Sequence, residues 1–136
     1  MNDLAFRVIG AANEVEGRLE GALGTIGLSL SKFNVLSRLA ETPDPMPLSQ
    51  LADRCSCVRS NMTQLVDRLE ADRLVERVAD PSDRRSVRAV LTDLGRERQA
   101  EALELVGETE RQVFGGLDEQ DRRALTRLLG QLGKCG

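Results

Sequence analysis

Residues 80–95 read DPSDRRSVRAVLTDLG, and this stretch decides the fold. Its first four residues suit a type I turn, because proline pre-sets φ at the second position and aspartate side chains cap the bend. Apolar side chains then alternate with their neighbours over residues 86–91, which indicates a half-buried strand. Residues 74–78, LVERV, form a matching strand upstream. The stretch therefore predicts a hairpin that holds Arg84 and Arg85 in the loop at its tip.

Helices are predicted on both sides of this hairpin. Apolar residues recur at spacings of three and four in the segments 3–23, 29–41, 48–55, 59–72, 92–114 and from 118 onward. Ser29, Thr92 and Asp118 are suited to cap helix N-termini, and residues 42–47, TPDPMP, form a proline-rich loop. A short helix, a tight turn, a longer helix and a hairpin follow one another, which is the order of a winged helix-turn-helix.

The length of the chain supports one domain, residues 1–136, of mainly α (α+β) class. Within it we expect the winged helix-turn-helix to occupy residues 28–92. The terminal helices, in residues 1–27 and 93–136, carry leucine-rich stripes that must be buried somewhere. We therefore expect them to form a dimerisation region shared by two copies of the chain.

The composition excludes several classes of protein. The chain has no histidine, tryptophan or tyrosine, so the commonest general base and the commonest metal ligand are missing. No serine, cysteine or lysine stands in a recognisable nucleophile motif. We expect neither an enzyme nor a protein with a cofactor or a metal site. Three phenylalanines are the only aromatic residues, too few for a surface that stacks the bases of a single strand.

Neither a membrane span nor a secretion signal is visible in the sequence. No apolar run approaches the roughly 18 residues that cross a bilayer. The N-terminal residues, MNDLAFRVIG, lack a basic segment followed by an apolar one. We expect a cytoplasmic protein.

The net charge of −3 is unevenly distributed along the chain. Residues 48–98 hold ten basic residues, all of them arginine, against nine acidic ones, whereas acidic residues exceed basic ones on either side. Arginine is the residue preferred for contacts to phosphates and base edges. On charge alone, an ordinary solvated surface explains the middle segment equally well.

The helix predicted at residues 59–72 has an apolar stripe and an opposite polar face. That polar face holds amides that can read adenine edges and hydroxyls that can bind bases or phosphates, at Asn61, Gln64, Ser60 and Thr63. Guanidinium groups that suit phosphates, or the minor groove, are those of Arg59, Arg68, Arg84 and Arg85. With the hairpin beside it, this helix predicts a double-stranded DNA-binding protein. The polar groups could instead merely face solvent.

Three motifs resemble the MarR family of bacterial transcriptional regulators. They are LSQLADR at residues 48–54, MTQLVDRLEADRLVER at residues 62–77, and DPSDRR followed by VLTDLG within residues 80–95. The resemblance runs from about residue 28 to residue 97. Its most specific part is the D-x-R element of Asp83 and Arg85, followed by a strand ending in Leu-Thr and then by glycine.

The resemblance implies a homodimer, joined by its N- and C-terminal helices, on a near-palindromic DNA operator. Such regulators commonly repress transcription and leave the DNA when a small-molecule effector or an oxidant intervenes. The resemblance also implies that Asp67 on the reading helix pairs with Arg85 of the wing, and that Asp83 supports the wing. The sequence identifies neither the operator nor the effector, and it does not separate a repressor from an activator.

Two positions depart from the family pattern. Position 73 is arginine where the family usually has glycine, which would take the left-handed conformation that ends the helix. Arg73 adopts it only at a cost of about 1 kcal/mol, so the helix could end differently and tilt the wing. Position 58 is valine where a capping serine or threonine is common, so the first turn of the reading helix is expected to be weak.

Cys55 and Cys57 lie at the predicted turn, and Cys135 is near the C-terminus. The C-x-C spacing is compatible with a repressor that senses thiol oxidation or a soft metal. The MarR pattern has apolar residues at both positions, and a reduced cysteine behaves as a small buried hydrophobe. With no histidine, a closed zinc site would need carboxylates or a second subunit. We favour a structural role and keep redox or soft-metal sensing as the alternative.

Two further questions stay open at the level of sequence. Val8, Ala12, Phe33 and Leu36 are candidates for the lining of an effector pocket, and each is equally credible as core. A winged-helix scaffold can also serve as a protein-interaction module without DNA, since a fold does not settle function. Salt-dependent binding to random duplex DNA would separate that module from a DNA-binding protein.

Overall fold

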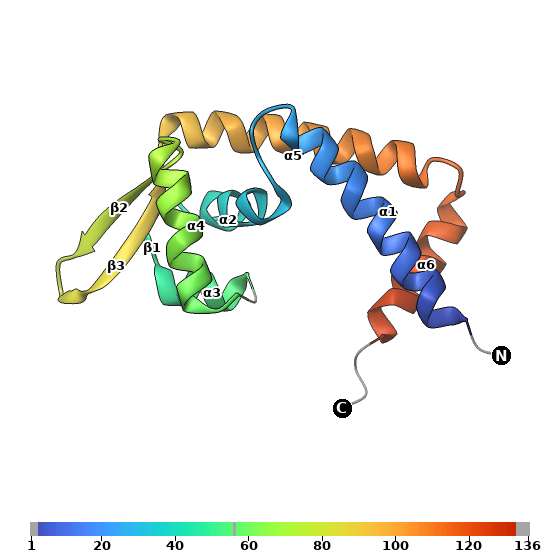
Figure 1. Ribbon diagram of the computed structural model, residues 1–136, viewed down its shortest axis with the longest axis horizontal. Helices are drawn as coiled ribbons and strands as arrows, with labels where there is room; N and C mark the ends of the chain where they lie inside the picture. The colour runs from blue at the N-terminus through green and yellow to red at the C-terminus, as the bar shows by residue number, and fades with distance from the viewer. Residues whose placement is uncertain (1–2, 56, 133–136) are drawn as a thin grey trace.

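The computed structural model describes residues 3–55 and 57–132 (Figure 1). Its elements are α1 (Leu4–Gly24), α2 (Leu30–Ala40), β1 (Met46–Pro47), α3 (Leu48–Arg54), α4 (Arg59–Ala71), β2 (Val75–Asp80), β3 (Asp83–Leu91), α5 (Asp93–Phe114) and α6 (Glu119–Gln131). The chain is therefore mainly helical with one small sheet, which confirms the predicted fold class. Elements α2, α3, α4 and the sheet form a lobe, and α5 runs from this lobe towards α6 and the N-terminal part of α1 (Figure 1).

The sheet has three antiparallel strands in the order β1-β3-β2. The predicted hairpin is present, with Val75 opposite Leu91 and Asp80 opposite Asp83. The prediction that Arg84 and Arg85 occupy the loop at its tip was wrong. Both residues lie in β3, because the turn between the strands needs only two residues.

Strand β1 lies in the segment that the sequence predicts as a proline-rich loop. Met46 pairs with Ala89 of β3, and both side chains are buried. Pro47 follows it on this outer strand, where a missing backbone N–H is tolerated. The two-residue strand thus fixes the loop after α2 to the wing hairpin.

One hydrophobic core fills the lobe. Its buried side chains are Leu23, Leu28, Val35, Leu36, Leu39, Met46, Leu51, Ala52, Met62, Val66, Leu69, Leu74, Val75, Ala89, Leu91 and Ala102. Helix α1 contributes only its C-terminal Leu23, and α5 contributes Ala102 as it leaves the lobe. The core holds α4 and the hairpin on one compact body.

Three side chains cap helices as predicted. The hydroxyl oxygens of Ser29 and Thr92 accept hydrogen bonds from the backbone N–H groups of Lys32 (3.2 Å) and Gly95 (2.9 Å). The carboxylate of Asp118 accepts one from the N–H of Asp121 at 2.7 Å. Each bond satisfies an N–H group that has no partner within its helix.

Helix α4 ends in the usual way although it lacks the usual glycine. Arg73 takes the left-handed conformation with φ of 64°. Its N–H donates to the carbonyl of Glu70, and the N–H of Leu74 donates to that of Leu69, the bond pattern of a Schellman ending. The altered helix ending that was considered as a cause of wing tilt is therefore absent. At the other end Val58 provides no side-chain cap, in agreement with the expected weak first turn.

The helices outside the lobe leave much apolar surface uncovered. Helix α6 has no buried residue, and Leu129 on it is 51% exposed. Phe6 on α1 is 77% exposed, and Leu103 on α5 also faces solvent. None of the helices in the described part of the chain combines the length and the apolar character that a membrane span needs.

Candidate nucleic-acid interface

Helix α4 turns one face to the core and the other to solvent. Met62, Val66 and Leu69 are buried. The side chains on the opposite face are all exposed, at Arg59, Ser60, Asn61, Thr63, Gln64 and Arg68. The structure thus brings these six predicted residues together on one accessible surface. The hydroxyl of Thr63 donates to the carbonyl of Arg59 at 3.0 Å. The Thr63 oxygen therefore remains available only as a hydrogen-bond acceptor.

Helix α3 supports the start of α4. Leu51 and Ala52 anchor α3 in the core, and the N–H of Cys57 donates to the carbonyl of Ala52 at 2.9 Å. The two helices meet across this short connection, so the N-terminal part of α4 is presented beside α3 (Figure 1). This arrangement is a helix-turn-helix.

A groove joins α4 to the wing. It is lined by Leu48, Ser49, Arg59, Thr63, Asp83, Arg85, Ser86 and Val87. The predicted helix residues Arg59 and Thr63 therefore share one concave surface with the predicted wing residues Asp83 and Arg85. The side chain of Arg84 lies outside the described part of the structure, although its backbone belongs to β3.

A second groove on the other side of α4 was missed by sequence reasoning. It is lined by Ser29, Ser31, Lys32, Cys57, Asn61, Gln64, Leu65 and Arg68. Lys32 comes from α2, and its ammonium donates to the carboxylate of Asp72 at 3.2 Å. No sequence pattern links Lys32 to residues some 30 positions later, because only the packing of α2 beside α4 brings them together.

The expected pair of Asp67 with Arg85 is absent. Asp67 instead accepts a hydrogen bond from Arg77 of β2 at 2.5 Å, and Arg77 also pairs with Glu70 at 2.8 Å. Burial by itself lowers the pKa of Arg77, but hydrogen bonds to the two carboxylates and their negative charges outweigh it and hold the pKa above its usual value. Arg77 lies on the strand beside α4, whereas Arg85 lies on the far strand of the hairpin, which explains the exchange of partner.

The hairpin is held in shape by two aspartates. The carboxylate of Asp83, the first residue of β3, accepts a hydrogen bond from the backbone N–H of Arg85 at 3.0 Å. Asp80, which is buried, accepts from the N–H and hydroxyl of Ser82 and from Arg88 at 3.1 Å. Hydrogen bonds from Ser82, followed by that from Arg88, hold the pKa of Asp80 below its usual value.

Cys55 and Cys57 are free, half-buried thiols that pack against the core. Burial raises the pKa of Cys55, and the nearby Arg38 only partly opposes this effect. The Cys57 thiol lies 3.4 Å from the carbonyl of Val58. Cys135 lies outside the described residues. Among the residues that are described, no three cysteine or acidic side chains gather in a way that could hold a metal ion.

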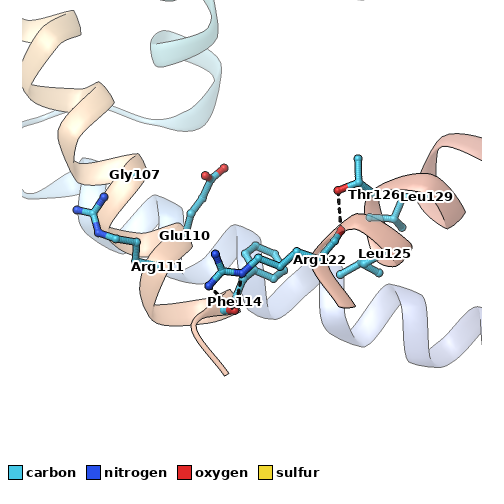
Figure 2. Close-up of a pocket in the computed structure, with 8 residues that line it drawn as sticks. All are labelled: Gly107, Glu110, Arg111, Phe114, Arg122, Leu125, Thr126 and Leu129. Carbon is cyan, nitrogen blue, oxygen red and sulfur yellow. Dashed lines mark hydrogen bonds between the residues drawn. The ribbon is translucent and has the colours of Figure 1, made fainter. Parts of the chain in front are cut away.

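The candidate effector residues do not form one site. Leu36 is part of the lobe core, whereas Val8 is exposed in the N-terminal half of α1. That half of α1 lies away from the lobe (Figure 1). A different pocket lies between α5 and α6, lined by the apolar side chains of Phe114, Leu125 and Leu129 and by Arg111 and Arg122 (Figure 2). Arg122 donates to the carbonyl of Phe114 there.

Comparison with known proteins agrees with this geometry. Residues 28–87 match the sequence model of the MarR family. The transcriptional regulator PecS of Dickeya dadantii is 30% identical over 133 residues, which cover 93% of this chain and 80% of PecS. The uncharacterised HTH-type transcriptional regulator YkoM of Bacillus subtilis is 37% identical over 98 residues, or 71% of this chain. That match covers 63% of YkoM, less than two thirds of its length.

A solved structure shows the same fold on DNA. The transcriptional repressor CouR, bound to a 23-mer DNA duplex, is 30% identical and superposes with a TM-score of 0.86, covering 93% of this chain and 89% of CouR. These relatives are transcriptional regulators, which confirms the expectation that the chain is not an enzyme. The chain belongs to the MarR family of transcriptional regulators.

Proposed function

We propose that the chain is a homodimeric regulator that binds double-stranded DNA at a near-palindromic operator and represses transcription. The observation that carries this proposal is the exposed polar face of α4, which lies beside a groove shared with Arg85. Both features stand on one buried core, so they can be presented to the same duplex. CouR, with the same fold, is a repressor bound to DNA.

In this proposal α4 enters the major groove. Asn61 and Gln64 read base edges with their amides, and Ser60 and Thr63 bind bases or phosphates. Arg59 and Arg68 contact phosphates, which position the helix without specifying sequence. Arg84 and Arg85 reach the adjacent minor groove or its phosphates.

The dimer is supported by the uncovered apolar side chains outside the lobe. Phe6, Ile9, Leu103, Leu128 and Leu129 are each at least half exposed. Exposed apolar surface of this extent marks an interaction site. A second copy of the chain covers it in our proposal, and the two lobes then reach half-sites related by a two-fold axis.

Release from DNA is proposed to follow binding of a small-molecule effector. An oxidant acting at Cys55 is disfavoured, because the thiolate is the reactive form and burial raises the pKa of this thiol. Repression follows when the dimer occupies a promoter and the effector prefers the DNA-free state.

The substitution Arg85→Ala tests the assigned role of the wing. We expect the affinity for an operator fragment to fall by about 1–3 kcal/mol in a gel-shift titration, with the dimer intact by sedimentation. Arg96→Ala, which removes the same charge from the exposed start of α5, is the control. Operator binding that is unchanged in Arg85→Ala would contradict the assignment.

A further inference from the structure

Arg77 joins the wing to the reading helix through four hydrogen bonds. Its Nη1 donates to Glu70 at 2.8 Å, and its Nη2 donates to Asp67 at 2.5 Å and to the backbone oxygen of Thr63 at 3.3 Å. The backbone N–H of Arg77 donates to the second carboxylate oxygen of Glu70 at 3.2 Å. The partners follow one another along α4 at intervals of four and three residues, so they line one side of the helix.

These contacts fix the orientation of the Arg77 guanidinium as well as its distance from α4. The guanidinium group is planar and its donors are rigidly arranged, so contacts to two carboxylates and a helix carbonyl define its orientation. The side chain of Arg77 is 25% exposed, and those of Asp67 and Glu70 are more exposed. Isolated pairs on a surface stabilise a protein little, whereas a network with defined geometry can hold two elements in register.

The same contacts decide what remains free to bind DNA. With Asp67 paired to Arg77, the guanidinium of Arg85 has no carboxylate partner among the described residues. The single positive charge of Arg77 also offsets one of the two negative charges of Asp67 and Glu70, from the side of α4 that faces β2. A carboxylate left unpaired on this helix would repel DNA phosphates and attract Arg85.

We propose that Arg77 is a positioning residue for DNA recognition. It fixes the wing relative to α4, so that Arg85 and the amides of Asn61 and Gln64 reach one duplex together, and it keeps Asp67 away from Arg85. This inference rests on the proposed function. It adds Arg77 to the residues that serve DNA recognition, as one that faces α4 and acts through Arg85 without touching the DNA itself.

The sharpest test removes the partners of Arg77 and leaves Arg77 in place. In Asp67→Ala/Glu70→Ala, two negative charges disappear from the DNA-binding lobe, so electrostatics alone predicts tighter binding to every duplex. The proposal predicts instead that binding to the selected sequence weakens relative to random duplex. The control Asp53→Ala/Glu76→Ala removes two exposed carboxylates from α3 and β2, outside these contacts.

The probe is a labelled duplex that the wild-type protein selects from a random pool, with a random duplex of equal length as reference. Fluorescence anisotropy gives both affinities at one salt concentration. We expect the ratio of selected to random affinity to fall about tenfold in the Asp67→Ala/Glu70→Ala variant and in Arg77→Gln. Hydroxyl-radical footprints should lose the protection given by the wing and keep that given by α4. The control pair should keep the wild-type ratio.

Several outcomes would overturn the inference. One is a ratio in Asp67→Ala/Glu70→Ala equal to that of the control pair. Another is a variant that unfolds below the assay temperature, because the contacts are proposed to orient the wing and not to hold the fold. If the wild-type protein itself fails to bind duplex DNA, the proposed function fails first, and the two failures are thereby distinguished.

Discussion

Gly95 at the start of α5 lies directly against the backbone carbonyl of Leu74. A Cβ atom at position 95 would stand 2.0 Å from the Leu74 oxygen and 3.2 Å from the side chain of Leu91. That carbonyl also accepts a hydrogen bond from Thr92, whose hydroxyl donates to the carbonyl of Arg73 at 2.7 Å. Arg73 and Leu74, which lie between α4 and β2, are therefore joined through their backbone carbonyls to the start of α5.

Gly95→Ala should destabilise the protein by about 1–3 kcal/mol, because the methyl group meets backbone and not a flexible side chain. Chemical denaturation measures the change in the free energy of unfolding. Gly107→Ala is the matched control on the same helix. The nearest atom to its Cβ is the end of the Arg111 side chain at 3.6 Å, so alanine should stabilise α5 by up to about 1 kcal/mol. Equal effects of the two substitutions would contradict this account.

Arg73→Gly should stabilise the protein. Arg73 has φ of 64°, a conformation that costs a residue with a side chain roughly 1 kcal/mol and costs glycine little. Ala71→Gly, at the last residue of α4, should instead destabilise the protein, by up to about 1 kcal/mol. Thermal unfolding of both variants shows whether each substitution raises or lowers the stability. A loss of stability in Arg73→Gly would show that Arg73 carries no strain in its left-handed conformation.

The wing should weaken in acid through Asp80. The pKa of this carboxylate is lowered in the folded protein by hydrogen bonds from Ser82 and then by Arg88. Its contribution to stability is therefore complete above the ordinary aspartate pKa of about 3.9 and is lost as the pH falls through the lowered value. Asp80→Asn should be less stable than wild type at pH 7, and this difference should begin to shrink below about pH 4 and disappear only below the lowered pKa of Asp80. A stability difference that persists unchanged at pH 3 would argue against this role.

Cys55 should react slowly with alkylating reagents. Burial is the main cause of its raised pKa, and the thiolate is the nucleophile, so little reactive form is present at pH 7. Mass spectrometry after iodoacetamide treatment should show Cys55 modified much more slowly in the folded protein than in urea. Equal rates in the two states would restore the thiol-sensing alternative.

Many of the helices and strands could be predicted from sequence because their signals are local. The caps at Ser29, Thr92 and Asp118 act within one helical turn of the residue that carries them. The alternation after residue 85 locates β3, and the apolar spacing in residues 59–72 fixes which face of α4 is buried. These patterns depend only on residues close together in the sequence, so they can be recognised without knowledge of the tertiary structure.

The remaining features depend on residues that meet only in the folded chain. Met46 is in a strand because Ala89 lies beside it, and nothing in the sequence around Met46 indicates this. Arg77 and Arg85 both follow Asp67 in the sequence and are both candidate partners for it. The strand order places Arg77 on the strand beside α4, so Asp67 pairs with Arg77 and not with Arg85. Lys32 joins the surface of α4 only through the packing of α2.

The central claim, that this chain binds double-stranded DNA, is tested most directly by the salt dependence of its binding. Labelled duplex is titrated with the full chain by fluorescence anisotropy at several salt concentrations between about 50 and 200 mM. Contacts between arginines and phosphates predict that the logarithm of the binding constant falls linearly and steeply with the logarithm of the salt concentration. Binding that is absent at the lowest salt, or that does not change with salt, would contradict the claim.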